Sequence, residues 1–257
     1  MPAHDLALLT AAARAAGRIA LRFWRQSPKT WEKGDQGPVT EADLAVNDML
    51  KATLLAARPD YGWLSEETPD DAARLGREQV FIIDPIDGTR AFIAGEEGFS
   101  HSLAVAHRGL VTAAVVYLPA LDRIYTASQA SAALRDGTPI AASTRERLEG
   151  AAILTTKAGL DPSHWPGGVP DVARSFRTSL AYRLCLVAEG RHDGMLTLRD
   201  TWEWDIAAGS LIAARAGVAV TDRNGAAIGF NQPSAQAHGV LALAPKLHPQ
   251  VLARLQG

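Results

Sequence analysis

Cysteine is nearly absent from this sequence. Cys185 is the single cysteine among 257 residues, so no disulfide can form within the chain. It stands inside the apolar run LCLVA, where a lone thiol is typical of a small buried hydrophobic residue and seldom of a nucleophile. We therefore predict a structural role for Cys185 and look for reactive groups elsewhere.

Long hydrophobic runs are also absent. No segment approaches the roughly 18 apolar residues that a membrane-spanning helix needs. The N-terminal stretch carries Asp5, Arg14, Arg18 and Arg22, and its apolar residues recur at steps of three and four. This pattern predicts an amphipathic helix packed on a core and not a targeting segment. We expect a cytoplasmic protein without a membrane partner.

A surplus of charge of either sign is missing too. The 26 basic and 28 acidic side chains give a formal net charge of −2. Proteins that bind the nucleic acid backbone usually carry a clear basic surplus. Hydrophobic residues make up 47% of the chain, which is enough to bury a substantial core. We expect a globular protein whose partners do not include a nucleic acid polymer.

The N-terminal part of the chain is predicted to contain helices followed by strands. A second helix is expected to start at Thr40, whose spacing to Asp43 matches a capping box, and to end before Pro59. The short apolar runs YGWL and VFII follow, and acids come directly after each. From Ser102, alternating segments separated by turns indicate an antiparallel meander.

The C-terminal part mixes strands and helices. The segments AAILTT and GMLTL favour strands, SLAYRLCLVAEG favours a helix, and a long helix is expected to begin near Asp205. We predict a boundary near residue 145, with an α+β lobe over residues 1–145 and an α/β lobe over residues 146–257.

The segment VFIIDPIDGTR has a polar half that packing does not explain. Pro85 favours an extended Asp84 at the end of a strand, and Gly88 permits close approach of the backbone to a ligand. A helix beginning at Gly88 or Thr89 would turn free N–H groups toward the carboxylates of Asp84 and Asp87. Carboxylates alone repel a phosphate, whereas carboxylates that hold Mg²⁺ attract one.

A magnesium site needs further oxygen ligands, because Mg²⁺ prefers six in octahedral array. Glu66 and Glu67 follow the YGWL strand, and Asp205 stands at a helix start. Each acid also has an ordinary alternative role. Asp43 can be a helix cap, Asp205 can offset the helix dipole, and Glu66 and Glu67 can be surface residues.

The spacing of the acids separates this sequence from two look-alikes. Phosphatases that form an aspartyl-phosphate carry D-x-D-G-T near the N-terminus, whereas Asp84 to Thr89 read D-x-x-D-G-T, one residue longer. Aspartic proteases need D-T-G or D-S-G, and the order here is D-G-T. An aspartyl nucleophile is disfavoured and an aspartic protease is excluded.

Four segments, taken in order, resemble the motif series of the inositol monophosphatase superfamily. They are GPVTEAD (37–43), SEE (65–67), DPIDGTRAF (84–92) and WDIAAG (204–209). The resemblance extends from the N-terminal helix to about residue 245. It implies a layered αβαβα sandwich and Mg²⁺-dependent, lithium-sensitive hydrolysis of a small-molecule phosphate monoester, with two or three Mg²⁺ ions.

The resemblance also implies a set of metal ligands. Glu66, Asp84 and the carbonyl of Ile86 would bind the first ion. Asp84, Asp87 and Asp205 would bind the second.

Catalytic and phosphate-binding groups follow from the same motifs. Thr89 and Asp43 would polarise the attacking water, with Glu66 as a further catalytic residue. The backbone of Gly88 and Thr89 would bind the phosphate. Relatives commonly form homodimers, so a homodimer is expected here. His101 lies near these motifs on a strand-like segment, where a packing role is at least as well supported as a chemical one.

The prediction of the substrate depends on the region from Ser179 to Asp205, whose motifs are less specific. SLAYRLCLVAEGRHD, EWD and TRAF resemble the 3'(2'),5'-bisphosphate nucleotidase branch. Arg183 would then meet a second phosphate, or it is a solvated charge. Leu198 stands where the inositol branch carries an acid, and Asp200 replaces that acid only if the loop is shifted.

Three alternatives remain beside a bisphosphate nucleotidase. The first is an inositol-1-monophosphatase, and the second is a histidinol-phosphate or sugar phosphatase of the same superfamily. The third and remotest is a metal-binding scaffold without activity. Fructose-bisphosphatase activity is disfavoured because Thr89-Arg90-Ala91 replaces the expected S-S-N pattern.

Overall fold

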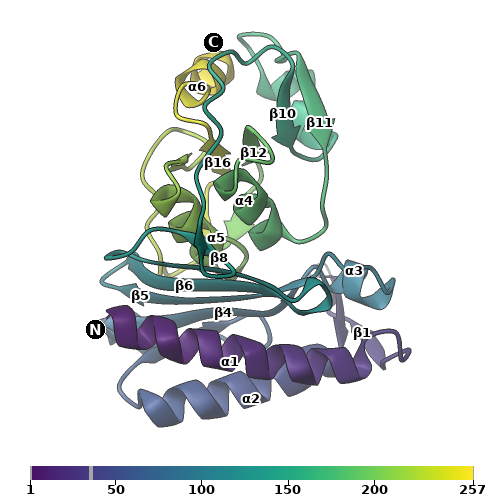
Figure 1. The fold of residues 1–257 in the computed structure, drawn as a ribbon, viewed down its shortest axis with the longest axis vertical. Helices are drawn as coiled ribbons and strands as arrows, with labels where there is room; N and C mark the ends of the chain where they lie inside the picture. Colours follow the sequence, from purple (N-terminus) through teal and green to yellow (C-terminus); the bar gives the residue numbers. More distant parts are fainter. Residues whose placement is uncertain (1, 35–36, 257) are drawn as a thin grey trace.

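Layers of helix and sheet alternate in the computed structural model, which describes residues 2–34 and 37–256 (Figure 1). Helices α1 (Pro2–Phe23) and α2 (Glu41–Ala57) cover one face of a first sheet. Helices α4 (Leu180–Ala188) and α5 (Glu203–Arg215) lie between this sheet and a second one. Helix α6 (His248–Gln256) packs on the outer face of the second sheet. The predicted αβαβα sandwich is confirmed.

The first sheet has seven strands in the order β3-β4-β5-β6-β7-β8-β9. Strands β3 and β4 are parallel, and every later neighbour is antiparallel, which confirms the predicted meander. The strands are β3 (Gly62–Ser65), β4 (Gln79–Asp87), β5 (Ser100–His107), β6 (Leu110–Leu118), β7 (Arg123–Ser128), β8 (Leu134–Arg135) and β9 (Thr138–Pro139).

The second sheet has five strands in the order β11-β10-β12-β16-β14. They are β10 (Ala151–Leu154), β11 (Val172–Ser175), β12 (Gly194–Thr197), β14 (Ala219–Thr221) and β16 (Val240–Leu243). The remaining described elements are two small strand pairs, the short helix α3 (Thr89–Ile93) and short 3-10 helices, among them Ala72–Gly76. The two pairs join β1 (Thr30–Glu32) to β2 (Pro38–Thr40) and β13 (Thr201–Trp202) to β15 (Gln236–Ala237).

Strand β4 is buried on both faces, which explains the unbroken VFII run. Phe81 and Ile83 pack against α1 and α2, whereas Val80 and Ile82 point to the side of α4 and α5. Successive side chains of a strand face opposite ways, so a strand between two helical layers has no polar face. Cys185 is buried in the α4 layer as predicted.

The predicted N-terminal helix is confirmed, and its apolar stripe is buried in the core. Leu9, Ala13, Ala16 and Ala20 are each inaccessible to solvent. No helix in the described part of the chain is long and apolar enough to cross a membrane. The division into lobes at residue 145 stays a prediction, because α4 and α5 pack on both sheets.

Candidate active site

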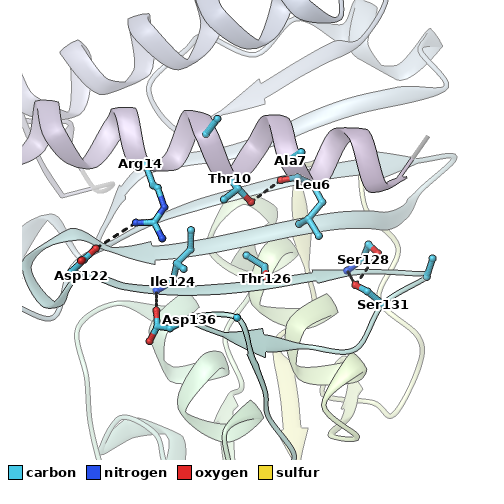
Figure 2. Close-up of a pocket in the computed structure, with 13 residues that line it drawn as sticks. Leu6, Ala7, Thr10, Arg14, Asp122, Ile124, Thr126, Ser128, Ser131 and Asp136 are labelled. Atoms are coloured by element: carbon cyan, nitrogen blue, oxygen red, sulfur yellow. Dashed lines mark hydrogen bonds and ion pairs between the residues drawn. The ribbon is translucent and has the colours of Figure 1, made fainter.

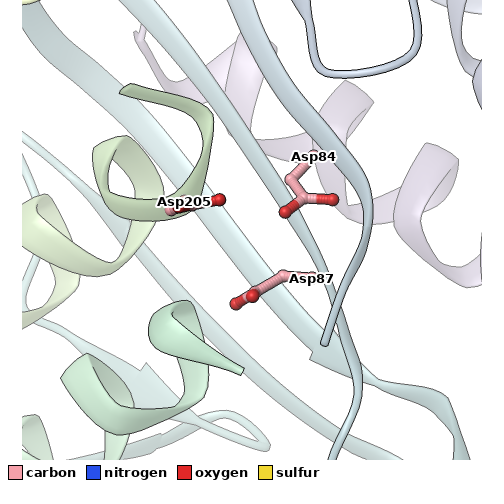
Figure 3. Close-up of side chains that lie close together, drawn as sticks. All are labelled: Asp84, Asp87 and Asp205. Carbon is pink, nitrogen blue, oxygen red and sulfur yellow. The ribbon is translucent and has the colours of Figure 1, made fainter. Parts of the chain in front are cut away.

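Three aspartates from two distant parts of the chain meet beside the first sheet. Asp84 and Asp87 come from β4, and Asp205 comes from the first turn of α5. One carboxylate oxygen of each lies within 4.8 Å of the others, and Figure 3 shows the three side chains converging. The structure therefore brings together the three residues expected to hold the second ion.

A bulge in β4 directs Asp84 and Asp87 to the same side of the sheet. Side chains three residues apart in a regular strand face opposite ways. Here Asp84 pairs with Ser102 and Asp87 with Ser100, so one extra residue lies between the two pairs. Pro85 sits in this interval and has no N–H to give to the ladder. The prediction that Asp84 ends the strand was wrong, since β4 continues through the bulge to Asp87.

The carboxylate of Asp87 is fixed by the N-terminal turn of α4. The hydroxyl of Ser179 donates to Oδ2 at 2.6 Å, and the Ala181 amide donates to the same oxygen at 2.7 Å. The Leu180 amide donates to Oδ1 at 3.1 Å. Three donors hold this side chain in one orientation before any ligand arrives.

The environment of Asp84 contrasts with that of Asp87, whose carboxylate accepts three hydrogen bonds. The Oδ1 of Asp84 is buried and has no hydrogen-bond partner among the described residues. Burial raises the pKa of Asp84 well above its ordinary value, and the nearby charges of Glu66 and Asp87 raise it further. Burial also raises the pKa of Asp205. A divalent cation would supply the missing partner and remove the mutual repulsion, so the donor set fits Mg²⁺.

Glu66 lies at the edge of this cluster, directly after β3. Its amide donates to the carbonyl of Ile83 at 3.2 Å, which holds the residue beside β4. Burial raises the pKa of Glu66, although attraction to Lys33 opposes the shift. Ile86 is buried, and its carbonyl accepts a hydrogen bond from Thr89 at 3.1 Å, which leaves a second lone pair for a metal.

Lys33 was missed at the sequence level. Its ammonium lies 3.0 Å from Glu66 Oε1 and 2.7 Å from Glu67 Oε1, and it comes from the loop after β1. Glu67 is therefore an ion-pair partner of Lys33 and not a solvated surface acid. Only the proximity of a lysine to the GPVTEAD segment could have indicated this contact.

Asp43 and Thr89 form the expected pair. The hydroxyl of Thr89 lies 3.3 Å from Asp43 Oδ1. Asp43 Oδ2 meanwhile accepts hydrogen bonds from the amide and hydroxyl of Thr40, which completes the predicted capping box. Burial raises the pKa of Asp43 to about 6. Helix capping and pairing with Thr89 are thus compatible, because they use different oxygens.

A cavity of about 480 Å³ opens over these groups. Its lining combines candidate site residues with a basic rim from the second half of the chain. It includes Glu66, Asp87, Gly88, Thr89, Arg90, Phe176, Thr178, Arg183, Arg199 and Asp205. A wider cavity of about 980 Å³ lies between α1 and β7, where Arg14 pairs with Asp122, and it contains none of the candidate residues (Figure 2).

Gly88 lies directly against Ser179, the residue that caps the start of α4. It adopts a φ of +93° at the start of α3, and a Cβ there would lie 3.2 Å from the amide nitrogen of Ser179. Only glycine combines this backbone conformation with this contact at low cost.

Comparison with known proteins gives these features a context. A model of the inositol monophosphatase family matches residues 2–257. The chain belongs to the inositol monophosphatase family. It is 34% identical over 203 residues to an inositol-1-monophosphatase of Rhizobium meliloti, with 75% of each chain covered. It is also 34% identical over 166 residues to a histidinol-phosphatase of Chlorobaculum parvum, with 63% of each chain covered.

A solved structure supports the same assignment. The extragenic suppressor protein suhB from Bartonella henselae superimposes with a TM-score of 0.84 at 28% identity, covering 98% of each chain. The expected superfamily, fold and enzyme class are thereby confirmed, and this member of the inositol monophosphatase family is a phosphatase. The role of each site residue stays a prediction.

Arg183, the residue expected to contact a second phosphate, does not lie on a solvated surface. Arg183 is 6% exposed, so the alternative of a solvated charge was wrong. Its Nε donates to the carbonyl of Arg177 at 2.5 Å, and its guanidinium lies 4.2 Å from the ring centre of Phe176. Burial lowers the pKa of Arg183 to about 10. These contacts fix Arg183 at the cavity wall.

Two further expectations concern the acid of the inositol branch and His101. Leu198 is buried and Asp200 pairs with His238 at 3.2 Å, outside the residues that line the cavity. Asp200 therefore does not replace the missing acid in this arrangement. His101 is fully buried, and its Nδ1 contacts the carbonyl of Pro85. Burial lowers the pKa of His101 to about 4, which leaves the ring neutral.

Proposed function

We propose that this phosphatase hydrolyses a small phosphate monoester at the Asp84, Asp87 and Asp205 cluster with bound Mg²⁺. The observation that carries the proposal is the buried Oδ1 of Asp84, which has no hydrogen-bond partner within residues 2–34 and 37–256 and lies among three converging carboxylates. A cluster of this kind is costly unless a cation neutralises it. Glu66 and the carbonyl of Ile86 would complete sites for two or three ions.

Bound Mg²⁺ would neutralise the phosphate and lower the pKa of a coordinated water. The chain's own groups then orient that water. The Thr89 hydroxyl has one hydrogen to donate, to Asp43 Oδ1 at 3.3 Å or to the Ile86 carbonyl at 3.1 Å. In either case an oxygen lone pair of Thr89 remains free to accept a hydrogen bond from that water. The backbone of Gly88 and Thr89 lines the same cavity and is assigned to the phosphate oxygens. Direct attack by water needs no covalent intermediate.

The proposed substrate is a nucleotide 3'(2'),5'-bisphosphate. Arg183 and Arg199 line the cavity on the side of the second sheet, where they provide positive charge for a second phosphate. Phe176 is 43% exposed beside them and offers an aromatic face to a base. The buried Leu198 provides no acid for the hydroxyl groups of inositol.

Inositol 1-phosphate and histidinol phosphate are the second candidates. They are favoured by the relatives named inositol-1-monophosphatase and histidinol-phosphatase. Both substrates carry one phosphate, so they make no use of a second cationic subsite. This difference allows a direct test.

Phosphate release should be measured from adenosine 3',5'-bisphosphate, inositol 1-phosphate, fructose 1,6-bisphosphate and histidinol phosphate. Each reaction is run with Mg²⁺, with EDTA and with added lithium. We expect the highest kcat/KM on the bisphosphate nucleotide, with loss of activity in EDTA and inhibition by lithium. Metal-independent turnover, or none on any of these esters, contradicts the proposed reaction. Preference for a monophosphate contradicts the proposed substrate alone.

A variant separates the two substrate classes further. Arg199 is exposed at the cavity rim, so Arg199→Gln should fold normally. We expect its KM for the bisphosphate to rise roughly tenfold, since a charge-assisted hydrogen bond is worth about 1.5–3 kcal/mol. The KM for inositol 1-phosphate should not change. Arg191→Gln, an exposed arginine that does not line the cavity, is the matched control.

The homodimer and the cytoplasmic location belong to the proposal as well. Both are expected from the family and are open to direct measurement by analytical ultracentrifugation and by imaging of the tagged protein.

A further inference from the structure

A buried arginine holds together two segments that lie beside the candidate metal site. Arg74 belongs to the 3-10 helix Ala72–Gly76, and its side chain is 1% exposed. Its Nε and Nη2 donate to the two carboxylate oxygens of Asp70 at 2.6 and 2.8 Å. This bidentate geometry fixes the guanidinium plane relative to the loop that follows Glu66 and Glu67.

The same guanidinium also donates hydrogen bonds to a distant loop. Nη1 donates to Asn231 Oδ1 at 2.6 Å, and Nη2 donates to the Gln232 carbonyl at 3.0 Å. The side-chain amide of Asn231 donates back to the Arg74 carbonyl at 3.3 Å. Arg74 and Asn231 are 157 positions apart in the sequence, so this contact exists only in the folded chain.

Glu203 completes the connection to the metal cluster. This glutamate is fully buried at the first position of α5, two residues before Asp205. Its two carboxylate oxygens accept the amides of Asn231 and Gln232 at 2.6 and 2.7 Å. Its own amide donates to the Ala235 carbonyl at 2.9 Å. Glu203 is thus tied to the same loop that Arg74 binds.

This hydrogen-bond network runs from Asp70 to Glu203, and each of these two residues is close in sequence to a candidate metal ligand. Asp70 lies four residues after Glu66, and Glu203 lies two residues before Asp205. Buried charges of this kind are expensive, and apolar side chains of similar size often give equal or greater stability. The charged side chains of Arg74 and Glu203 are explained if they fix the relative position of the segments that carry Glu66 and Asp205.

We propose that Arg74 and Glu203 are positioning residues that set the separation between Glu66 and Asp205 and thereby the affinity for Mg²⁺. The inference rests on the proposed function only in taking Glu66 and Asp205 as metal ligands. Neither Arg74 nor Glu203 lines the cavity over the aspartates, so they act through the segments they hold.

The test measures Mg²⁺ affinity by isothermal titration calorimetry and unfolding temperature in EDTA. The variants are Arg74→Lys, which keeps the charge but cannot serve Asp70, Asn231 and Gln232 together, and Glu203→Gln, which keeps the shape. Loss of outer-shell support typically weakens metal binding 10–100-fold. We expect a loss of at least roughly tenfold in each variant.

Arg58→Met is the matched control for a purely structural ion pair. Arg58 pairs with Asp5 at 3.0 Å between α2 and α1, away from the cluster. This variant should have a lower unfolding temperature than the wild type and the same affinity for Mg²⁺.

The outcomes separate the inference from the proposed function. If Arg74→Lys and Glu203→Gln fold and bind Mg²⁺ like the wild type, the positioning role is wrong while the metal site stands. If Arg58→Met, at equal destabilisation, loses as much Mg²⁺ affinity as Arg74→Lys and Glu203→Gln do, the positioning role is also wrong. A wild-type protein that binds no Mg²⁺ overturns the metal site and this inference with it.

Discussion

The hydroxyl of Ser179 donates a 2.6 Å hydrogen bond to the carboxylate of Asp87, a residue 92 positions earlier in the chain. The Ser179 oxygen also lies 3.0 Å from the hydroxyl of Ser100 and accepts the amide of Tyr182 as the cap of α4. One side chain therefore starts a helix of the second half and orients a candidate metal ligand of the first half.

Replacing Ser179 with alanine should weaken the site more than the fold. We expect Mg²⁺ affinity to fall roughly tenfold, the lower end of the cost of losing an outer-shell partner. Loss of the helix cap should lower the free energy of unfolding by about 1 kcal/mol. Calorimetric titration and thermal unfolding check both. Ser163→Ala, at an exposed serine remote from the cluster, is the control. Wild-type affinity in Ser179→Ala would show that Asp87 needs no such support.

Asp205→Asn should reduce kcat by more than roughly 100-fold, or about 2.7 kcal/mol of transition-state stabilisation. The reason is loss of one of the three carboxylates that converge within 4.8 Å. Asp200→Asn changes a nearby acid that pairs with His238 outside the cavity lining, and it should retain normal activity. Steady-state phosphate release measures both variants. Near-normal activity of Asp205→Asn would remove this residue from the metal site.

Metal-free protein should lose stability as the pH rises. Burial raises the pKa of Asp84, of Asp205 and, to about 6, of Asp43. A carboxyl with a raised pKa contributes its stability below the unfolded value near 4, and this stability is lost as the pH passes through the folded value. We expect the unfolding temperature in EDTA to fall between pH 4 and 7 more steeply than in Asp84→Asn.

Mg²⁺ should reverse this decline, and its stabilising effect should grow over the same interval because binding requires ionised carboxylates. Differential scanning fluorimetry at constant ionic strength gives the comparison. Equal pH slopes for the wild type and Asp84→Asn in EDTA would contradict the electrostatic account.

Gly88→Ala should be more damaging than an ordinary glycine replacement. A left-handed backbone costs a residue with a Cβ about 1–2 kcal/mol, and at Gly88 the new atom would also lie 3.2 Å from the Ser179 amide. Gly137→Ala isolates the first effect, since Gly137 has a φ of +80° and open space around it. Thermal unfolding and kcat of the two variants should differ, with activity lost only at Gly88. Equal effects would mean that the contact with Ser179 is unimportant.

Much of the fold was predictable because its signals are local. The capping box at Thr40 and Asp43 and the apolar stripe of α1 depend on residues within one helix, and both are confirmed. The bulge in β4 was not predicted, because its position depends on how Asp84 and Asp87 pair with the neighbouring strand. The burial of Arg183 was also missed, since Phe176 and the Arg177 carbonyl reach it only after the loop folds back.

The sequence by itself determined the reaction class and the acids to consider. The spacing of the motifs can be read without a structure, and Mg²⁺ prefers carboxylate oxygens as ligands. Tertiary structure decided how those acids meet. It brought Asp205 to Asp84 and Asp87, paired Lys33 with Glu66, and tied Asp87 to Ser179. The physical reason is that these contacts join residues far apart in the chain. Such residues meet only when helices pack on both faces of the first sheet and bury its apolar side chains.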